Sequence, residues 1–309
     1  MTASPAGSTG KPRIGFVGIG LMGEGMAARM LAAGHPLAAL AHRNRAPLER
    51  LMAKGASEAK TAREMAATCD VVFLCVTGSP QVESVMRGPD GILAGARPGL
   101  IVADCSTADP NSTMALAAEA KAKGVALADC PLGGTPAQAV EGKLSTMVGA
   151  DEEVYARLEP ILLTWAAKAV RVGPVGDGHK MKLLNNFLSM GYAAIYAEAL
   201  ALAAKSGITP KTFDSVVRGG RMDCGFYQTF MQYVLERDRA AHKFTLVNAY
   251  KDMRYLSAMA DGVSVANPLG AAVKNSFAAA VSAGRGEDFV PMLSDFVGKG
   301  AGVDLAKKG

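Results

Sequence analysis

The sequence predicts an α/β protein in which a doubly wound parallel sheet is followed by an all-α half. Three observations predict this architecture. Short apolar runs alternate with stretches of helical spacing over about the first 150 residues, a glycine-rich turn follows the first apolar run, and strand-like runs become rare after about residue 177.

Short apolar runs bounded by turn residues predict buried strands at 13–17, 37–41, 70–76, 100–103, 125–129 and 145–148. Helical spacing separates them, at 22–33, 46–54, 79–87 and 110–123. Gly34 supplies a stop signal after the first of these helices, and Asp109-Pro110 supplies a start signal for another. This alternation predicts a parallel sheet with helices on both faces.

The second half is expected to begin with one long helix, because Lys180 to Ala204 contains no proline. From Phe187 to Ala204 this stretch is almost wholly apolar, and Glu198 is its only charged residue. Eighteen such residues fit either a membrane span or a central helix buried on most sides, between domains or subunits. The charge in the middle of the run and the lack of a second span favour the buried helix. Further helices are expected at 210–219, 225–238, 244–260 and 268–283.

Composition excludes several classes of function. The formal net charge is +5 in 309 residues, with basic residues scattered among acidic ones, so no nucleic-acid partner is expected. The four histidines share no metal-ligand spacing, so no metal is expected. The five cysteines include no C-x-x-C pair, and three fall in or beside predicted strands, which favours buried thiols in a reducing compartment such as the cytoplasm. The N-terminal stretch looks like neither a signal peptide nor a membrane span.

The turn Gly18-Ile19-Gly20-Leu21-Met22-Gly23 has the spacing of a dinucleotide cradle. Gly18 would permit the tight turn, Gly20 would let the backbone approach a pyrophosphate, and Gly23 would allow close packing of helix on strand. A glycine-rich loop without function is the alternative. The strand before and the helix after favour a Rossmann-type site, with helix amides directed at the phosphates.

The residues after the second predicted strand decide between the two nicotinamide cofactors. NAD-binding sheets place an acidic residue there, whereas this chain has His42-Arg43-Asn44-Arg45. Guanidinium groups suit a 2′-phosphate, which favours NADP. The alternative is a solvated loop in which Arg43 only stacks on adenine, with NAD as the cofactor.

Lys182 and Asn186 lie at i and i+4, on one face of the predicted long helix. A cofactor that moves hydride needs a group that moves a proton, and Lys182 is the candidate. The alternative is an exposed, solvated lysine. Lys180, two positions earlier, should face elsewhere and be dispensable.

Five motifs in order resemble those of the β-hydroxyacid dehydrogenase family, which includes 3-hydroxyisobutyrate dehydrogenase, tartronate semialdehyde reductase and glyoxylate/succinic semialdehyde reductases. The resemblance covers about residues 13–300. It rests on Gly15 to Gly23, Asp104-Cys105-Ser106-Thr107, Asp129-Cys130-Pro131-Leu132-Gly133-Gly134-Thr135, Gly176 to Asn186 with its G-x-G-x-x-x-K-x-x-N-N pattern, and Lys251-Asp252-Met253 with Phe244 upstream.

The resemblance implies a role for each matching residue. Lys182 would be the general acid in reduction and the base in oxidation, with a pKa depressed beside a cationic nicotinamide. Asn186 would hold the substrate and orient the amine. Cofactor contacts are implied for Val76, Thr77, Thr107, Phe244 and Lys251. Thr77 departs from the usual Leu-Pro at that point, and an ion pair with Asp252 is the alternative for Lys251.

Substrate contacts are implied for Ser106, Gly133, Gly134 and Thr135. The loop departs from the family pattern, because Gly133 replaces a serine and Thr135 replaces the last glycine. A carboxylate could still bind the backbone amides of this loop, and the Thr135 hydroxyl could replace the missing serine.

These inferences predict three segments: a flexible tail over residues 1–12, an NAD(P)-binding Rossmann-type domain over 13–174, and an all-helical substrate and oligomerisation domain over 175–309. We expect an NADP-preferring oxidoreductase that interconverts a small 3-hydroxy acid and its semialdehyde, at a cleft between the two domains. We also expect a homodimer or homotetramer with no membrane or nucleic-acid partner. The alternatives are an imine reductase-like enzyme, and a non-catalytic cofactor-binding or interaction protein on the same fold. Sugar-phosphate oxidation would require a longer helical half.

Overall fold

The computed structural model describes residues 10–306, so most of the expected tail, residues 1–9, lies outside the described residues. The chain forms two compact units, Met1–Lys182 and Leu183–Gly309, which we call the sheet unit and the helical unit. The division falls inside one long helix, α9 (Asp177–Lys205). The order of an α/β half followed by an all-α half is confirmed.

The sheet unit contains one mixed but mostly parallel sheet, with strand order β3-β2-β1-β4-β5-β6-β8-β7 and β9 paired to β8. The six strands from β3 to β6 in this order pair in parallel. β8 runs antiparallel to β6 and β7, a departure from the all-parallel sheet expected. The strands are β1 (Ile14–Val17), β2 (Leu37–Leu40), β3 (Ser57–Glu58), β4 (Val71–Leu74), β5 (Ile101–Asp104), β6 (Ala126–Asp129), β7 (Leu132–Gly133), β8 (Leu144–Gly149) and β9 (Ala166–Gly173).

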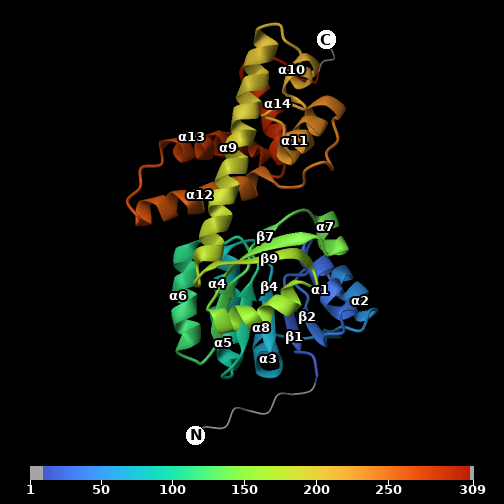
Figure 1. Cartoon of the computed structure of the whole chain (residues 1–309), viewed down its shortest axis with the longest axis vertical. Coiled ribbons are helices and arrows are strands. Elements are labelled where there is room, and N and C mark those ends of the chain that lie inside the picture. The colour runs from blue at the N-terminus through green and yellow to red at the C-terminus, as the bar shows by residue number, and fades with distance from the viewer. Residues whose placement is uncertain (1–9, 307–309) are drawn as a thin grey trace. The chain divides into compact units, whose positions relative to one another are not determined.

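Helices cover both faces of this sheet (Figure 1). Successive residues of a strand point to opposite faces, so Phe16 packs in the core with α1 while Val17 packs in the core with α3 and α6. Burial on both faces explains why the central strands read as unbroken apolar runs. The helices of this unit are α1 (Gly23–Ala32), α2 (Ala46–Met52), α3 (Ala62–Thr68), α4 (Ser79–Arg87), α5 (Ile92–Gly95), α6 (Pro110–Lys121), α7 (Pro136–Glu141) and α8 (Glu152–Leu162).

Sequence patterning did not identify several elements of this unit, of which α8 and β9 are the longest. α8 carries Pro160 inside the helix, and proline is normally a helix breaker. β9 is an edge strand of which only Ala166 is buried, so it lacks an apolar run. Both elements depend on tertiary packing rather than on local pattern.

The helical unit consists of the rest of α9 followed by α10 (Pro210–Val217), α11 (Gly225–Glu236), α12 (Leu246–Gly262), α13 (Pro268–Ala280) and α14 (Leu293–Gly300). Its core gathers aromatic and aliphatic residues such as Tyr227, Phe230 and Phe277. By length and composition α9 could cross a membrane, a test that the core helix of a globular protein also passes. Within the single chain 44% of its apolar window is buried, so α9 keeps an exposed apolar face; burial of that face between subunits stays a prediction.

Candidate active site

The glycine turn follows β1 at the carboxyl edge of the sheet and leads into α1. Gly18 has φ +96°, and a Cβ there would lie 2.2 Å from the carbonyl oxygen of Cys75. A Cβ on Gly23 would lie 2.1 Å from the carbonyl oxygen of Gly18. The turn and the packing of α1 on β1 therefore require glycine at both positions.

Gly20 is different, because a Cβ added there would meet no atom of the protein within 4 Å. The fold itself does not require glycine at this position. The open space beside Gly20 lies in the turn that precedes the N-terminus of α1, where backbone amides and the helix dipole favour a phosphate. The turn, with Ile19 buried and Leu21 exposed, therefore fits the pyrophosphate of a dinucleotide.

The segment after β2 presents exposed polar side chains at His42, Arg43 and Asn44. Asn44 Oδ1 accepts a hydrogen bond from the Ala46 amide at 3.1 Å and so helps start α2. Arg45 forms a bidentate ion pair with Glu58 at 2.9 and 3.0 Å. Among the described residues, no ion pair involves Arg43. Arg43 is therefore the guanidinium of this segment that is available to a 2′-phosphate.

Ser106 ties together the loops that follow β4 and β5. Its side chain is buried and its Oγ accepts from the Val76 amide at 3.0 Å, while its own amide donates to Asp104 Oδ1 at 2.9 Å. Ser106 was expected to contact substrate. In the structure it is buried, and its hydrogen bonds join the two loops. Thr77 is exposed, and Val76 and Thr107 are half-buried at the carboxyl ends of these strands, where ligands of such sheets bind.

The substrate loop forms β7 and the N-terminus of α7. Thr135 is the N-cap of α7 in a capping box: its Oγ1 accepts from the Gln138 amide and its amide donates to Gln138 Oε1. The Thr135 amide is therefore engaged inside the protein, whereas its hydroxyl accepts there and keeps its own proton to donate. A Cβ on Gly133 would lie 2.6 Å from the Ser145 hydroxyl, so that hydroxyl occupies the space where a serine at 133 would begin.

The first turn of α9 is fixed by a buried carboxylate at the end of β6. Asp129 Oδ1 accepts from the Gly176 amide at 2.7 Å, and Oδ2 accepts from the His179 amide at 2.6 Å. Burial raises the pKa of Asp129, while His179 and these amides act to lower it. Three residues after His179 the helix carries Lys182, which is half-buried.

Lys180 and Lys182 differ as expected in their surroundings. Lys180 is exposed and its ammonium lies 2.9 Å from Asp177 Oδ1, a pair one turn apart on the helix surface. Surface pairs of this kind contribute little to stability. Lys180 is therefore a suitable control for the role of Lys182.

In the helical unit, Asp252 brings together two of the expected site residues. Asn186 is buried and its Nδ2 donates to Asp252 Oδ2 at 2.7 Å, and the Lys251 ammonium lies 3.2 Å from Asp252 Oδ1. The ion pair considered as the alternative for Lys251 is thus present. Phe244 is half-buried just before α12. The sequence analysis considered Asp252 only as an ion-pair partner of Lys251, and did not predict its hydrogen bond to Asn186.

The cysteines carry no chemistry at this edge of the sheet. All five are free thiols, and Cys105 and Cys130 are buried. Desolvation raises the pKa of Cys75 to about 12 and raises the pKa values of Cys105 and Cys130 well above the usual value for a thiol, so these thiols stay protonated at neutral pH. Within residues 10–306, no group of three His, Cys, Asp or Glu side chains is arranged to hold a metal ion.

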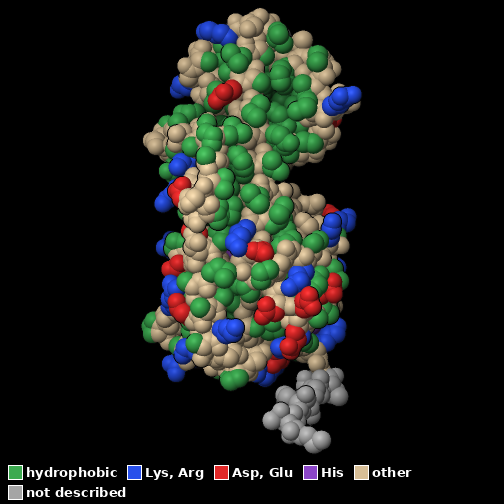
Figure 2. Space-filling view, turned by 60° about the vertical axis from the view of Figure 1, so that its left-hand side comes forward, with side chains coloured by type: hydrophobic (Ala, Val, Ile, Leu, Met, Phe, Trp, Pro, Cys, Tyr) green, Lys and Arg blue, Asp and Glu red, His purple; other side chains and the backbone are tan. Residues whose placement is uncertain are grey.

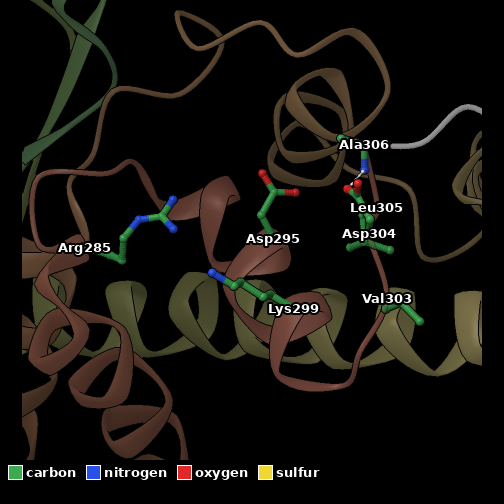
Figure 3. A pocket seen from close by; sticks show the side chains of 7 residues that line it. All are labelled: Arg285, Asp295, Lys299, Val303, Asp304, Leu305 and Ala306. Carbon is green, nitrogen blue, oxygen red and sulfur yellow. Dashed lines mark hydrogen bonds between the residues drawn. The ribbon is translucent and has the colours of Figure 1, made fainter.

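A cavity of about 440 Å³ in the helical unit lies between α14 and the segment 303–306, and none of the motif residues lines it. Figure 3 shows Arg285, Asp295 and Lys299 directed toward it. Two of these charges have partners already: Arg285 pairs with Asp288, and Asp295 binds Tyr233 and Arg237. We therefore place the candidate active site at the carboxyl edge of the sheet, with the first turns of α9 that carry Lys182.

Residues 13–173 match the family described as the NAD-binding domain of 6-phosphogluconate dehydrogenase. Residues 176–294 match the family described as NAD-binding of NADP-dependent 3-hydroxyisobutyrate dehydrogenase. The chain belongs to the β-hydroxyacid dehydrogenase family. The relatives of the chain are dehydrogenases and reductases of this family. The chain is therefore an NAD(P)-dependent hydroxyacid dehydrogenase, an oxidoreductase that acts on small substrates.

Three relatives illustrate the range of this dehydrogenase family. The 2-(hydroxymethyl)glutarate dehydrogenase of Eubacterium barkeri is 34% identical over 205 residues, covering 66% of this chain and 68% of that protein. The 3-hydroxyisobutyrate dehydrogenase of Pseudomonas aeruginosa is 33% identical over 295 residues, covering 93% and 99%. The 3-sulfolactaldehyde reductase of Escherichia coli is 29% identical over 295 residues, covering 96% and 99%.

Solved structures agree on the fold. A 3-hydroxyisobutyrate dehydrogenase from Salmonella typhimurium matches with TM-score 0.82 and 28% identity, covering 93% of this chain and 100% of that one. A protein solved with NADP⁺ and 2-OPP (TM-score 0.80, 24% identity, covering 92% and 99%) and an imine reductase from Myxococcus stipitatus (0.61, 20%, covering 93% and 99%) share the fold alone.

The contrast among the three glycines yields a prediction. We expect Gly20→Ala to leave stability within about 0.5 kcal/mol of the wild type, because its Cβ meets nothing in the protein. The same Cβ would occupy the phosphate cradle, so NADPH and NADH should both bind more weakly, as fluorescence titration would show.

Gly18→Ala is the matched control. Its positive φ and its clash with Cys75 should cost about 1–3 kcal/mol or more of unfolding free energy. Unchanged cofactor affinity in a well-folded Gly20→Ala variant would rule out the cradle.

Proposed function

We propose that this dehydrogenase prefers NADP and interconverts a small 3-hydroxy acid and its semialdehyde, with Lys182 as the general acid and base. The observation that carries the proposal is the placement of Lys182 on α9. It is half-buried and lies one turn after the backbone amide that Asp129 anchors, and Asn186 follows one turn later. An exposed, solvated lysine would need no such anchoring.

A bound nicotinamide supplies or accepts a hydride at its C4 carbon. In the reducing direction Lys182 donates a proton from Nζ to the carbonyl oxygen as the carbonyl carbon gains the hydride, which gives the alcohol. In the oxidising direction the neutral amine of Lys182 accepts the hydroxyl proton. Asn186 is held by Asp252 with its Nδ2 committed, so its Oδ1 is the atom that can accept from the substrate or the Lys182 amine.

The preference for NADP rests on the segment after β2. This segment offers an exposed Arg43 and no acidic residue, and an acidic side chain there would repel a 2′-phosphate. Arg43 can bind a phosphate bidentately, and Arg45 is already paired with Glu58. NAD is the alternative cofactor.

For the substrate we propose a small carboxylate such as tartronate semialdehyde, glyoxylate or 3-hydroxyisobutyrate. In the cap of α7 the Thr135 hydroxyl accepts a hydrogen bond, so its own proton can still be donated to a carboxylate, beside the backbone amide of Gly134. The names of the relatives, which include a 3-hydroxyisobutyrate dehydrogenase and a 3-sulfolactaldehyde reductase, support a short acidic substrate.

Two alternatives remain, an imine reductase-like enzyme and a non-catalytic protein on the same fold. The imine reductases share only the fold with this chain. The presence of both Lys182 and Asn186 favours the hydroxyacid dehydrogenase over either alternative. The free, high-pKa thiols are consistent with the cytoplasmic location that we propose.

We further propose a homodimer or homotetramer formed through the exposed face of α9, with no membrane or nucleic-acid partner. Leu184, Leu188, Tyr192, Ile195 and Leu202 recur at helical spacing on this face and are 40–70% exposed. On the side of the molecule seen in Figure 2, hydrophobic side chains gather on the helical unit, with few charged ones among them. A second copy of the same helix can cover such a stripe symmetrically.

The role of Lys182 predicts that Lys182→Ala lowers kcat by about 10²- to 10⁴-fold, the usual contribution of a positioned general acid. The cofactor should still bind, because the alanine removes only the proton donor. Turnover of glyoxylate with NADPH and of 3-hydroxyisobutyrate with NADP⁺ would measure the loss. Lys180→Ala should turn over like the wild type, and equal activity in both variants would remove Lys182 from the mechanism.

The role of Arg43 predicts a change in cofactor choice. Losing a hydrogen bond between a guanidinium and a phosphate costs about 1.5–3 kcal/mol, so Arg43→Ala should lower the affinity for NADPH roughly tenfold or more. NADH lacks the 2′-phosphate and should bind almost as before. Arg45→Ala is the control for loop stability. Equal losses for both cofactors in Arg43→Ala would indicate adenine stacking instead.

The apolar face of α9 predicts the assembly. Wild-type protein should scatter light as a dimer or tetramer, and Leu188→Glu should shift it toward the monomer by burying a charge at the interface. Val216→Glu, at an apolar residue of α10 that is 78% exposed, is the control and should leave the mass unchanged. A monomeric wild-type protein would contradict the proposal.

A further inference from the structure

His179 is completely buried in the sheet unit, and every polar atom of its ring has a neighbour that can bond it. Its Nε2 lies 3.1 Å from the carbonyl oxygen of Ser106, and its Nδ1 lies 2.8 Å from Thr113 Oγ1. A carbonyl oxygen can only accept, so Nε2 carries the proton of that bond. The ring therefore binds the loop after β5 to the first turn of α9.

The same residue is anchored on its backbone side. The His179 amide donates to Asp129 Oδ2 at 2.6 Å, at the end of β6. The carboxylates of Asp104 and Asp129 lie 3.9 Å from the two ring nitrogens, and both are buried. Helix α9 is thus held at one residue to the ends of two adjacent strands, β5 and β6.

The network continues to the loop after β4. Ser106 accepts at its carbonyl from His179 and at its Oγ from the Val76 amide at 3.0 Å. The segments expected to contact the nicotinamide, Val76-Thr77 and Thr107, are therefore joined to α9 through two consecutive hydrogen bonds. Lys182 lies three residues beyond His179, at the next turn of the same helix.

We propose that His179 is a positioning residue that sets the place of Lys182 relative to the loops after β4 and β5. This inference rests on the proposed role of Lys182. The side chain itself contacts no reacting atom, because it is fully buried. Its effect is geometric: a displacement of a catalytic group by about 1 Å can cost on the order of 10²-fold in rate.

Two substitutions separate the bond to Ser106 from the bond to Thr113. In His179→Gln, the amide nitrogen lies near the original Nε2 and can still donate to the Ser106 carbonyl. In His179→Asn, the shorter amide reaches only the place of Nδ1, beside Thr113. We expect His179→Asn to lower kcat by about 10- to 100-fold with little change in KM or in NADPH affinity. His179→Gln should retain kcat within about fivefold of the wild type.

A primary isotope effect distinguishes positioning from simple loss of folded enzyme. With NADPH deuterated at the transferred position and glyoxylate as the probe, misplacing the proton donor slows the chemical step, so the isotope effect on kcat should rise in His179→Asn. A smaller fraction of folded protein would lower kcat and leave the isotope effect unchanged. His35→Asn is the matched control, because His35 is also buried in the sheet unit and its Nδ1 lies 3.1 Å from the Pro12 carbonyl, away from α9.

Wild-type kcat in His179→Asn, or a reduced kcat with an unchanged isotope effect, would overturn the inference. If His179→Asn does not fold, a folded His179→Gln variant that loses 10²-fold or more in kcat would overturn it equally. Lys182→Ala, assayed in parallel, separates the two proposals. Full activity in Lys182→Ala overturns the proposed function, whereas an inactive Lys182→Ala beside a normal His179→Asn overturns only the role of His179.

Discussion

The candidate site depends on a carboxylate without solvent contact at the end of β6. Asp129 accepts hydrogen bonds from two backbone amides where α9 begins. Burying a carboxylate is costly unless such donors bind its oxygens. Removing either partner would leave a charge or two amides unsatisfied in the interior. The start of α9, up to Lys182, therefore has a defined place on the sheet edge.

The opposite requirement governs the glycine turn. There the protein leaves a space unfilled. Gly18 and Gly23 are required by close contacts with the backbone, whereas a Cβ at Gly20 would meet no protein atom within 4 Å. Packing within the protein therefore gives no reason for glycine at position 20. The open position next to a helix N-terminus leaves room for an anion, which agrees with the NAD-binding family that the chain matches.

The substrate loop shows how departures from a family pattern can be coupled. Gly133 faces the hydroxyl of Ser145 across the β7–β8 pair, and Thr135 has become the cap of a short helix. The loop is thus stabilised by its own hydrogen bonds at positions where the family pattern has a serine and a glycine. This rearrangement concerns the part of the site that distinguishes one small acid from another.

The sequence by itself determined the order of the two halves, the glycine turn, the family, and the spacing of Lys182 and Asn186. These are local properties, since a glycine spacing or an i and i+4 pair needs no distant residue to be recognised. Tertiary structure alone decided the contacts of His179 and Asp129, the bond from Asn186 to Asp252 and the burial of Ser106. Each of these depends on partners tens of residues away along the chain, such as Ser106 and His179, which only the pairing of strands or the packing of helices brings together. Edge strand β9 and the proline-containing α8 were missed for the same reason, because neighbouring elements stabilise them and their own pattern does not.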